Sequence, residues 1–186
     1  MRVFWHSHGE QLLLFFRSVF WTVLVPGMVT IYFPRLILGQ RLSAFAQNWS
    51  TAQYLSFLVI AAGTAVLMRC IWDFAVVGRG TLSFVDAPKK LVIVGLYRYV
   101  RNPMYIGVLL VLLGETVWFE SVPLLEYTAG WFVLVNLAVL LYEEPTLRHR
   151  FGESYDHYCR SVHRWWPGRP FHPAGTDEHQ ARSFSA

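Results

Sequence analysis

The chain has 186 residues, which fits a single domain, and 54% of them are hydrophobic while only 15% are charged. The apolar residues come in blocks long enough to cross a bilayer, so this composition excludes an ordinary soluble domain and indicates an integral membrane protein. The formal net charge of +4 comes from basic residues beside those blocks. This pattern is typical of cytoplasmic anchoring rather than of nucleic-acid binding.

The first two apolar runs predict two membrane-spanning helices. Residues 12–32 match about one bilayer thickness, and we expect Pro26-Gly27 to kink this helix. A short polar connection over residues 34–50 separates it from a second span at about residues 53–77. Cys70 in this span and Cys159 further on have no metal-ligand spacing, so we expect two free thiols and no metal site.

Near the end of the second span, Arg69 and Asp73 are spaced i to i+4 and therefore share one helix face. Ionisable residues inside a span usually face the bundle interior or a wet cavity, which makes this pair a candidate for substrate contact. A simple intrahelical ion pair near the interface explains it equally well. The basic loop at residues 78–101 follows, and its glycines Gly78 and Gly80 permit a close approach to a ligand.

A polar, basic and aromatic segment then changes abruptly into a third apolar run at residues 103–118. Asn102 is a strong N-cap residue and Pro103 suits the first helical position, so a helix is predicted to begin there. Its free N–H groups and dipole would attract an anion beside Arg101. A tight connection at 119–123 predicts an antiparallel hairpin with a fourth span at about 124–142. Glu115 could line a substrate cavity or reach the opposite interface.

The fold class predicted is therefore an all-α integral membrane protein with about four transmembrane helices. Loop charges place both termini in the cytoplasm. After the last span, apolar residues recur at helical spacing and predict an amphipathic helix on the membrane surface, closed by Trp165-Trp166-Pro167. Those apolar residues are Leu147, Phe151, Tyr155, Tyr158 and Val162. We expect residues 1–167 to form one domain, with the cofactor motifs in 78–167, and residues 168–186 to form a disordered tail.

Arg101-Asn102-Pro103-Met104-Tyr105-Ile106-Gly107 resembles the Arg-His-Pro-x-Tyr-x-Gly signature of the isoprenylcysteine carboxyl methyltransferase and phospholipid methyltransferase group. Further matches, in the same order as in that group, are Gly78-Arg79-Gly80-Thr81, Glu143-Glu144-Pro145, Phe151-Gly152-Glu153-Ser154-Tyr155 and Arg164-Trp165-Trp166-Pro167. The resemblance runs from about residue 63 to residue 167. Asn102 stands where many relatives carry His, so a role that rests on an imidazole does not carry over.

The resemblance implies a membrane enzyme that uses S-adenosylmethionine. The start of the third span, with Arg101, offers donors to the cofactor's carboxylate, and Glu143 and Glu144 offer acceptors to its ammonium group. The cofactor-binding candidates are Gly78, Gly80, Thr81, Tyr97, Arg101, Asn102, Pro103, Met104, Tyr105, Gly107, Glu143 and Glu144. The substrate-side candidates are Arg69, Asp73, Glu115 and Arg148. Glu144 and Arg148 are also spaced as a simple i to i+4 surface pair.

We expect a lipophilic acceptor, such as a prenylated thiol-acid, a phospholipid amine or a small hydrophobic molecule, to enter from the bilayer, with no nucleic-acid partner. Oligomeric state and catalytic residues stay open. A second possibility is an enzyme similar to sterol reductases that uses NADPH. A third is a non-catalytic scaffold or transporter subunit. The short chain leaves little room for a dinucleotide, and two adjacent glutamates favour a cationic cofactor over a polyanionic one.

Overall fold

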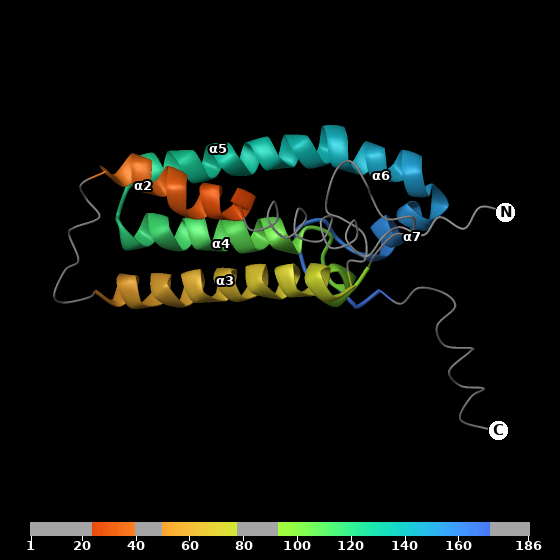
Figure 1. Ribbon diagram of the computed structural model, residues 1–186, viewed down its shortest axis with the longest axis horizontal. Helices are drawn as coiled ribbons and strands as arrows, with labels where there is room; N and C mark the ends of the chain where they lie inside the picture. Colours follow the sequence, from red (N-terminus) through yellow and green to blue (C-terminus); the bar gives the residue numbers. More distant parts are fainter. Residues whose placement is uncertain (1–23, 40–49, 78–92, 172–186) are drawn as a thin grey trace, which may run out of the picture.

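The computed structural model describes residues 24–39, 50–77 and 93–171, and all regular structure in these ranges is helical, with no strand. Three long helices lie side by side: α3 (Thr51–Val77), α4 (Pro103–Trp118) and α5 (Val122–Ala138). α4 lies between the other two (Figure 1). The all-α prediction is therefore confirmed for the described part of the chain.

The first apolar run ends later than predicted. Its described part is helical from Leu24 to Leu38, with a π-helical segment (Met28–Tyr32) followed by α2 (Phe33–Leu38). Pro34 occupies the first turn of α2, where a missing N–H is tolerated. The helix ends at Gly39, which has a φ of +51°. The prediction of a polar connection beginning at residue 34 is thus wrong, because the wider π turn lets the helix continue through the proline.

Glycines hold α3 and α4 together. A Cβ added to Gly63 would lie 2.7 Å from the carbonyl oxygen of Gly107, and one added to Gly107 would lie 2.9 Å from Cγ of Leu67. The two helix backbones therefore approach closely where both residues are glycine. Small residues at such contacts are the usual way in which helices pack inside a membrane, where apolar surface alone gives no preference for another helix over lipid.

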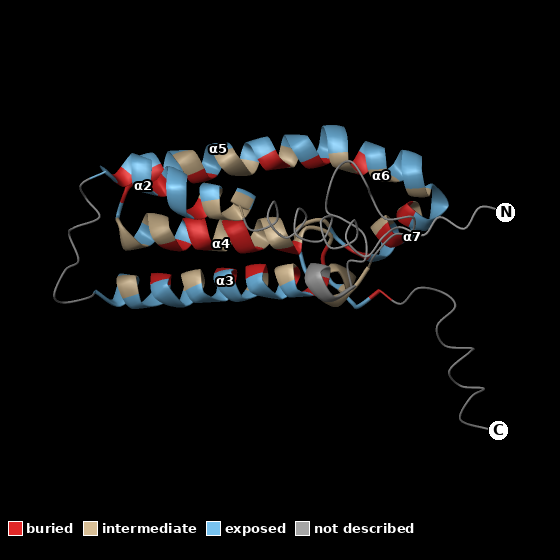
Figure 2. Ribbon diagram, in the orientation of Figure 1, coloured by how far each residue is buried: buried red, intermediate tan, exposed pale blue. Residues whose placement is uncertain are grey.

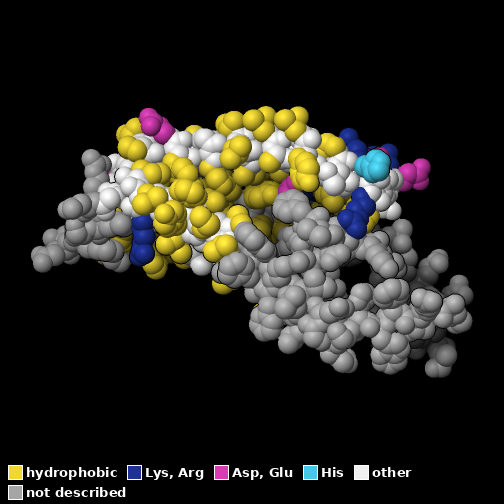
Figure 3. Space-filling model, turned by 45° about the horizontal axis from the view of Figure 1, so that its top comes forward, with side chains coloured by type: hydrophobic (Ala, Val, Ile, Leu, Met, Phe, Trp, Pro, Cys, Tyr) yellow, Lys and Arg dark blue, Asp and Glu magenta, His cyan; other side chains and the backbone are white. Residues whose placement is uncertain are grey.

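The outward faces of the bundle are apolar. Figure 2 shows that α3 is buried towards α4 and exposed on its other side, and Figure 3 shows hydrophobic side chains over the middle of the molecule with charged ones mainly towards its two ends. Exposed large apolar side chains of α3 and α5 include Tyr54, Leu55, Phe57, Leu58, Leu125, Val133, Leu134 and Leu137. Such a belt fits contact with lipid chains.

Among the described residues, two helical stretches are long and apolar enough to cross a membrane, Thr51–Asp73 and Val122–Phe151. The helices Leu24–Leu38 and Pro103–Trp118 are apolar but shorter. The second and fourth predicted spans thus meet the length expected of a bilayer crossing. The predicted antiparallel hairpin is also present, since α4 ends at Trp118, Ser121 precedes α5, and the two helices pack together.

The helix of the fourth span continues without a break beyond the apolar run. A π-helical segment, η4 (Val139–Glu143), leads directly into α6 (Glu144–Phe151), and Gly152, with a φ of +51°, ends α6. The next helix, α7 (Glu153–Ser161), starts a new direction. The single amphipathic helix predicted over this region is therefore two helices, because the left-handed conformation at Gly152 interrupts the apolar stripe.

That stripe packs inside the protein. Tyr155, Tyr158 and Val162 are buried in one cluster with Phe171, and Leu147, Phe151, Cys159 and Ile93 pack against it. The cluster supports the loop that precedes α4, which includes the 3₁₀ turn η3 (Gly95–Arg98). The periodicity thus predicted which residues of this region are buried. They pack against other parts of the protein rather than against the membrane surface.

The segment after α7 runs back along this loop. The Arg101 N–H donates to the carbonyl of His163 at 3.0 Å, the Gly168 N–H to that of Tyr99 at 2.9 Å, and the Phe171 N–H to that of Arg98 at 2.8 Å. We call residues 163–171 the C-terminal strap. The packed chain therefore continues through Phe171, past the boundary expected at residue 167, and the rest of the predicted tail lies outside the described residues.

Candidate cofactor site

The start of α4 lies where the sequence predicts it, but it is capped differently. Asn102 occupies the N-cap position, and its carbonyl accepts the Ile106 N–H at 3.2 Å. Its side-chain oxygen accepts no capping hydrogen bond, and its Nδ2 donates to the carbonyl of Arg164 at 3.4 Å. The first N–H groups of α4 therefore have no side-chain acceptor from Asn102, and they stay available to an anion.

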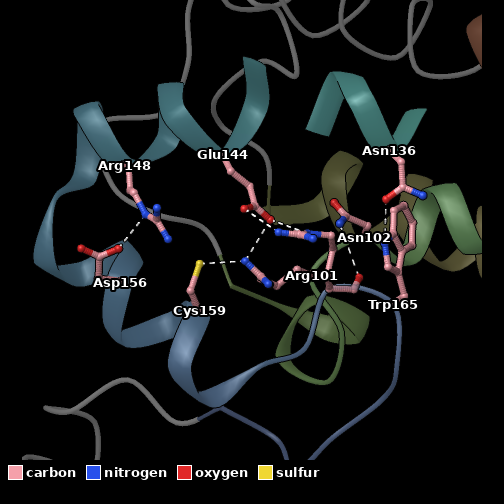
Figure 4. A network of polar contacts seen from close by, with 9 residues as sticks. Arg101, Asn102, Asn136, Glu144, Arg148, Asp156, Cys159 and Trp165 are labelled. Carbon is pink, nitrogen blue, oxygen red and sulfur yellow. Dashed lines mark hydrogen bonds and ion pairs between the residues drawn. The ribbon is translucent and has the colours of Figure 1, made fainter. Parts of the chain in front are cut away.

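Arg101 connects this helix start to two other elements. Its Nη1 donates to Oε1 of Glu144 at 3.0 Å and to Sγ of Cys159 at 2.9 Å (Figure 4). Its side chain is only 13% exposed, and its Nε has no hydrogen-bond partner among the described residues. A buried guanidinium in this state is held in place and retains donor capacity for another acceptor.

Glu144 is the centre of a charged cluster. Arg164 donates from Nε to Oε1 at 2.7 Å and from Nη2 to Oε2 at 2.9 Å, in addition to the contact from Arg101. These hydrogen bonds to the carboxylate raise the pKa of the Arg164 guanidinium. Two cations on one carboxylate leave the Arg101–Glu144–Arg164 cluster with an excess positive charge, which favours an anion next to it.

The alternative of a surface pair between Glu144 and Arg148 does not match the ion pairs that these two residues form. Glu144 is 8% exposed and turns inward, whereas Arg148 pairs with Asp156 of α7 at 2.9 Å, with both side chains about half exposed (Figure 4). The i to i+4 spacing allowed the pair, but Glu144 instead binds Arg101 and Arg164, whose side chains are more buried than that of Arg148. Arg148 thus lies outside the candidate site and ties α6 to α7.

Glu143 takes a separate partner. The hydroxyl of Tyr105, one turn into α4, donates to Oε1 of Glu143 at 2.6 Å, and the Tyr105 ring packs edge to face on Trp131 of α5. Glu143 ends the π segment η4, and such single π turns recur at functional sites because they re-aim neighbouring side chains. Two adjacent glutamates therefore have different surroundings: Glu144 has two cations, while Glu143 has one neutral donor.

Tyrosines extend this arrangement towards α3. The Tyr158 hydroxyl of α7 donates to the carbonyl of Tyr97 at 2.7 Å. Tyr97 interacts electrostatically with Glu143 and Tyr105 and also with Cys70 of α3. Burial raises the pKa of both Tyr97 and Tyr158 above the ordinary value, so both phenols stay neutral donors at physiological pH. We call Glu143, Tyr105, Tyr97 and Cys70 the polar row, because these residues extend from η4 to α3 at one end of the bundle.

The other predicted site residues lie in three places: at the start of α4, in the contact between α3 and α4, and further along these two helices. Pro103 is buried at the helix start, Met104 packs against the core cluster of Leu67 and Val108, and Gly107 forms the close α3–α4 contact. At the end of α3, Asp73 is buried and pairs with Arg69 at 3.0 Å. Gly107 therefore has a packing role, and its cofactor-binding role stays a prediction.

Glu115 lies three turns along α4 from the helix start, so it is not part of the same cluster. Its Oε2 has no hydrogen-bond partner among the described residues. Gly78, Gly80 and Thr81 lie outside the described residues. In the described part of the chain, no group of three or more His, Cys, Asp and Glu side chains could hold a metal ion.

Several contacts at this end were not predicted. The sequence marked Arg164 only as part of a motif and Cys159 only as a free thiol, yet Arg164 donates to Glu144 and Cys159 accepts from Arg101. Trp165 packs on Phe132 with ring centroids 5.4 Å apart, and its Nε1 donates to Oδ1 of Asn136 at 3.2 Å. The one sequence signal for this last contact is an amide within the apolar run of α5, which needs a hydrogen-bond partner.

Comparison with protein families gives a single assignment. The family model described as phospholipid methyltransferase matches residues 51–154. The match contains α3, α4, α5 and α6, and with them Arg101, Tyr105, Glu143 and Glu144. No significant match was found among curated proteins or among solved structures. Since the match spans more than half of the chain, the chain belongs to the phospholipid methyltransferase family.

Proposed function

We propose that this membrane methyltransferase takes its methyl group from S-adenosylmethionine and transfers it to a lipid-like acceptor that arrives from the bilayer. The observation that supports this most directly is the charge pattern at the start of α4. There, an excess of positive charge on Arg101 and Arg164 lies beside a glutamate, Glu143, that has no cationic partner among the described contacts. An α-amino acid group, with one carboxylate and one ammonium, fits such a pattern.

The ammonium group is assigned to Glu143. Glu144 already accepts three hydrogen bonds from two guanidiniums, and a further cation next to it would be repelled by both. Glu143 accepts one hydrogen bond from Tyr105 and keeps acceptor capacity on its other oxygen. Sequence reasoning treated the two glutamates as equivalent, whereas their partners separate their roles.

The carboxylate is assigned to the first turn of α4. Its N–H groups receive no side-chain cap from Asn102, and Arg101 has an unpartnered Nε among the described residues. Both are donors, and the helix dipole adds to their attraction for an anion. Glu144 then acts as the counter-charge that fixes the two arginines, and its own contact with the cofactor is not required.

The bound cofactor would supply an electrophilic methyl group on a sulfonium, and the protein's task is to hold donor and acceptor in line. Alignment of this kind can lower a barrier by several kcal/mol. Burial raises the pKa of Tyr97, so it can orient polar atoms without becoming charged, and the Tyr105 hydroxyl orients Glu143 through its hydrogen bond. The exposed apolar faces of α3 and α5 give a lipophilic acceptor direct access from the bilayer.

A ligand-stability comparison tests the proposal. The detergent-purified full chain is heated with S-adenosylmethionine, S-adenosylhomocysteine or NADPH. A ligand that binds only the folded state at one hundred times its Kd adds about 2.7 kcal/mol of stability. We expect stabilisation by the two adenosyl compounds and none by NADPH. Stabilisation by NADPH alone would favour the reductase alternative, and no effect of any of the three would favour a non-catalytic membrane protein.

The assignment of the ammonium group needs its own comparison. Glu143→Gln should weaken S-adenosylhomocysteine binding roughly ten- to a hundredfold, because a hydrogen bond to a charged group contributes about 1.5–3 kcal/mol. Glu126→Gln makes the same chemical change at an exposed position at the start of α5 and should leave affinity unaltered. Equal affinities in these two variants would remove Glu143 from the site.

A further inference from the structure

Asp73 is a buried carboxylate that nothing in the proposed site has used. Its side chain is 7% exposed at the end of α3, and its Oδ1 accepts from Nη2 of Arg69 at 3.0 Å. Its Oδ2 is buried and has no hydrogen-bond partner among the described residues. An unpartnered carboxylate oxygen removed from water is costly, so its retention calls for a ligand that donates to it.

The chain around Asp73 is shaped to keep this oxygen where it is. Gly95 has a φ of +54°, and a Cβ added there would overlap Oδ2. Only glycine therefore lets the η3 turn come down on the carboxylate. The same turn carries Tyr97, which interacts electrostatically with Tyr105 and Glu143, and Cys70 lies one turn before Asp73 on α3. Asp73 thus lies next to the α3 end of the polar row, whose other end is Glu143.

The charge at Asp73 determines what kind of donor fits. Arg69 already supplies a positive charge to Oδ1, although its own side chain is 55% exposed. The unpaired Oδ2 therefore suits a neutral donor, such as a hydroxyl, better than a second cation. Acidic side chains recognise ribose in this way in other nucleotide sites, where they accept hydrogen bonds from the sugar's hydroxyl groups.

We propose that Asp73 binds the ribose hydroxyls of the cofactor's nucleoside half. This inference rests on the proposed function: with the amino acid end held by the start of α4 and Glu143, Asp73 of α3 would hold the nucleoside end. Gly95 would then let the η3 turn pack against the Asp73 carboxylate and hold it in position to bind the sugar. Arg69 holds the carboxylate from the opposite side.

Calorimetric titration of the detergent-purified full chain with S-adenosylhomocysteine and its 2′-deoxy and 3′-deoxy analogues tests the proposal. In the wild type, loss of at least one hydroxyl should lower affinity roughly tenfold or more, as expected for a hydrogen bond to a charged acceptor. In Asp73→Ala, the parent compound and that analogue should bind with equal, reduced affinity. Gly95→Ala, which displaces Oδ2, should reduce the same hydroxyl dependence.

Glu126→Ala is the matched control, since it removes an exposed carboxylate at the start of α5 and leaves Asp73 and Arg69 in place, and it should keep the hydroxyl dependence. Wild-type binding that is indifferent to both hydroxyls would overturn the inference even if no Asp73 variant folds. A full hydroxyl dependence in Asp73→Ala would also overturn it and leave Asp73 a structural residue. No binding of S-adenosylhomocysteine to the wild type would reject the proposed function as well, which distinguishes the two failures.

Discussion

Arg164 binds Glu144 in parallel through two hydrogen bonds, from Nε to Oε1 at 2.7 Å and from Nη2 to Oε2 at 2.9 Å. Arg164 belongs to the C-terminal strap and Glu144 is the first residue of α6, so this contact joins the strap to the end of the membrane helix. Arg101 adds a third contact from the loop before α4. Three segments distant in the sequence are therefore fixed around one carboxylate.

Glu144→Gln should destabilise the protein because it leaves Arg101 and Arg164 close together without a counter-charge. Removing one partner of a buried ion pair costs about 3–5 kcal/mol, and the partial exposure of Arg164 places the loss near the lower limit. Thermal unfolding in detergent measures it, with Glu126→Gln as the exposed control. A melting temperature equal to that of the control would mean that the cluster contributes no stability.

Tyr105→Phe should weaken S-adenosylhomocysteine binding severalfold through loss of the 2.6 Å hydrogen bond that orients Glu143. Because the two residues act as a pair, the effect of Tyr105→Phe in a Glu143→Gln background should be much smaller than in the wild type. Affinities of the two single variants and the double variant, measured by calorimetry, decide this. Additive losses would show that Tyr105 and Glu143 bind the ligand independently.

The α3–α4 contact gives a prediction about Gly107, a residue of the motif. Gly107→Ala should destabilise the protein by about 1–3 kcal/mol, because its Cβ would lie 2.9 Å from Cγ of Leu67 and 3.1 Å from the carbonyl oxygen of Gly63. Gly130→Ala in α5 is the matched control, since a Cβ there meets nothing within 4 Å, and it should be neutral or slightly stabilising. Melting temperatures compare the two.

A cofactor-binding role for Gly107 predicts the opposite pattern. In that case Gly107→Ala would keep the wild-type melting temperature without ligand and lose only affinity. The packing role predicts that the unliganded protein itself is less stable. Circular dichroism melting curves with and without S-adenosylhomocysteine therefore separate the two.

The sequence predicted those parts of the fold that depend on local signals. Asn102-Pro103 marked the first residue of α4, and the apolar periodicity selected Tyr155, Tyr158 and Val162, all of which are buried. Both features follow from the chemistry of neighbouring positions. The break at Gly152 was missed because a glycine inside a periodic stripe is compatible with either a continued helix or a turn.

The partners at the candidate site could not be predicted in the same way. Arg101 and Arg164 are 43 and 20 residues from Glu144 in the sequence, so their meeting depends on how α4, α6 and the strap pack. The nearer Arg148 satisfied the spacing rule for a helical pair but binds Asp156 instead. The capping hydrogen bond expected of Asn102 is absent, and its side chain binds the strap through Nδ2 at the carbonyl of Arg164.

The topology makes a fourth prediction. In a cysteine-free background, Arg160→Cys in α7 and Glu126→Cys at the start of α5 are both exposed and lie at opposite ends of the bundle. A membrane-impermeant thiol reagent should label them from opposite faces of sealed vesicles, with Arg160→Cys on the cytoplasmic side. Labelling of both from one face would contradict a crossing by α5.

The last prediction concerns Asn102, the N-cap residue of α4. Its side chain makes no capping bond, so Asn102→Ala should change stability by less than the roughly 1 kcal/mol that loss of a cap normally costs. Asn102→Asp should also leave the unliganded protein stable, because a carboxylate beside Arg101 and the α4 dipole is favourable. That same carboxylate would occupy the anion position, and S-adenosylhomocysteine affinity should fall about tenfold or more. Calorimetry and melting curves on both variants separate the two effects. If Asn102→Asp binds as tightly as Asn102→Ala, the cofactor's carboxylate does not lie at the start of α4.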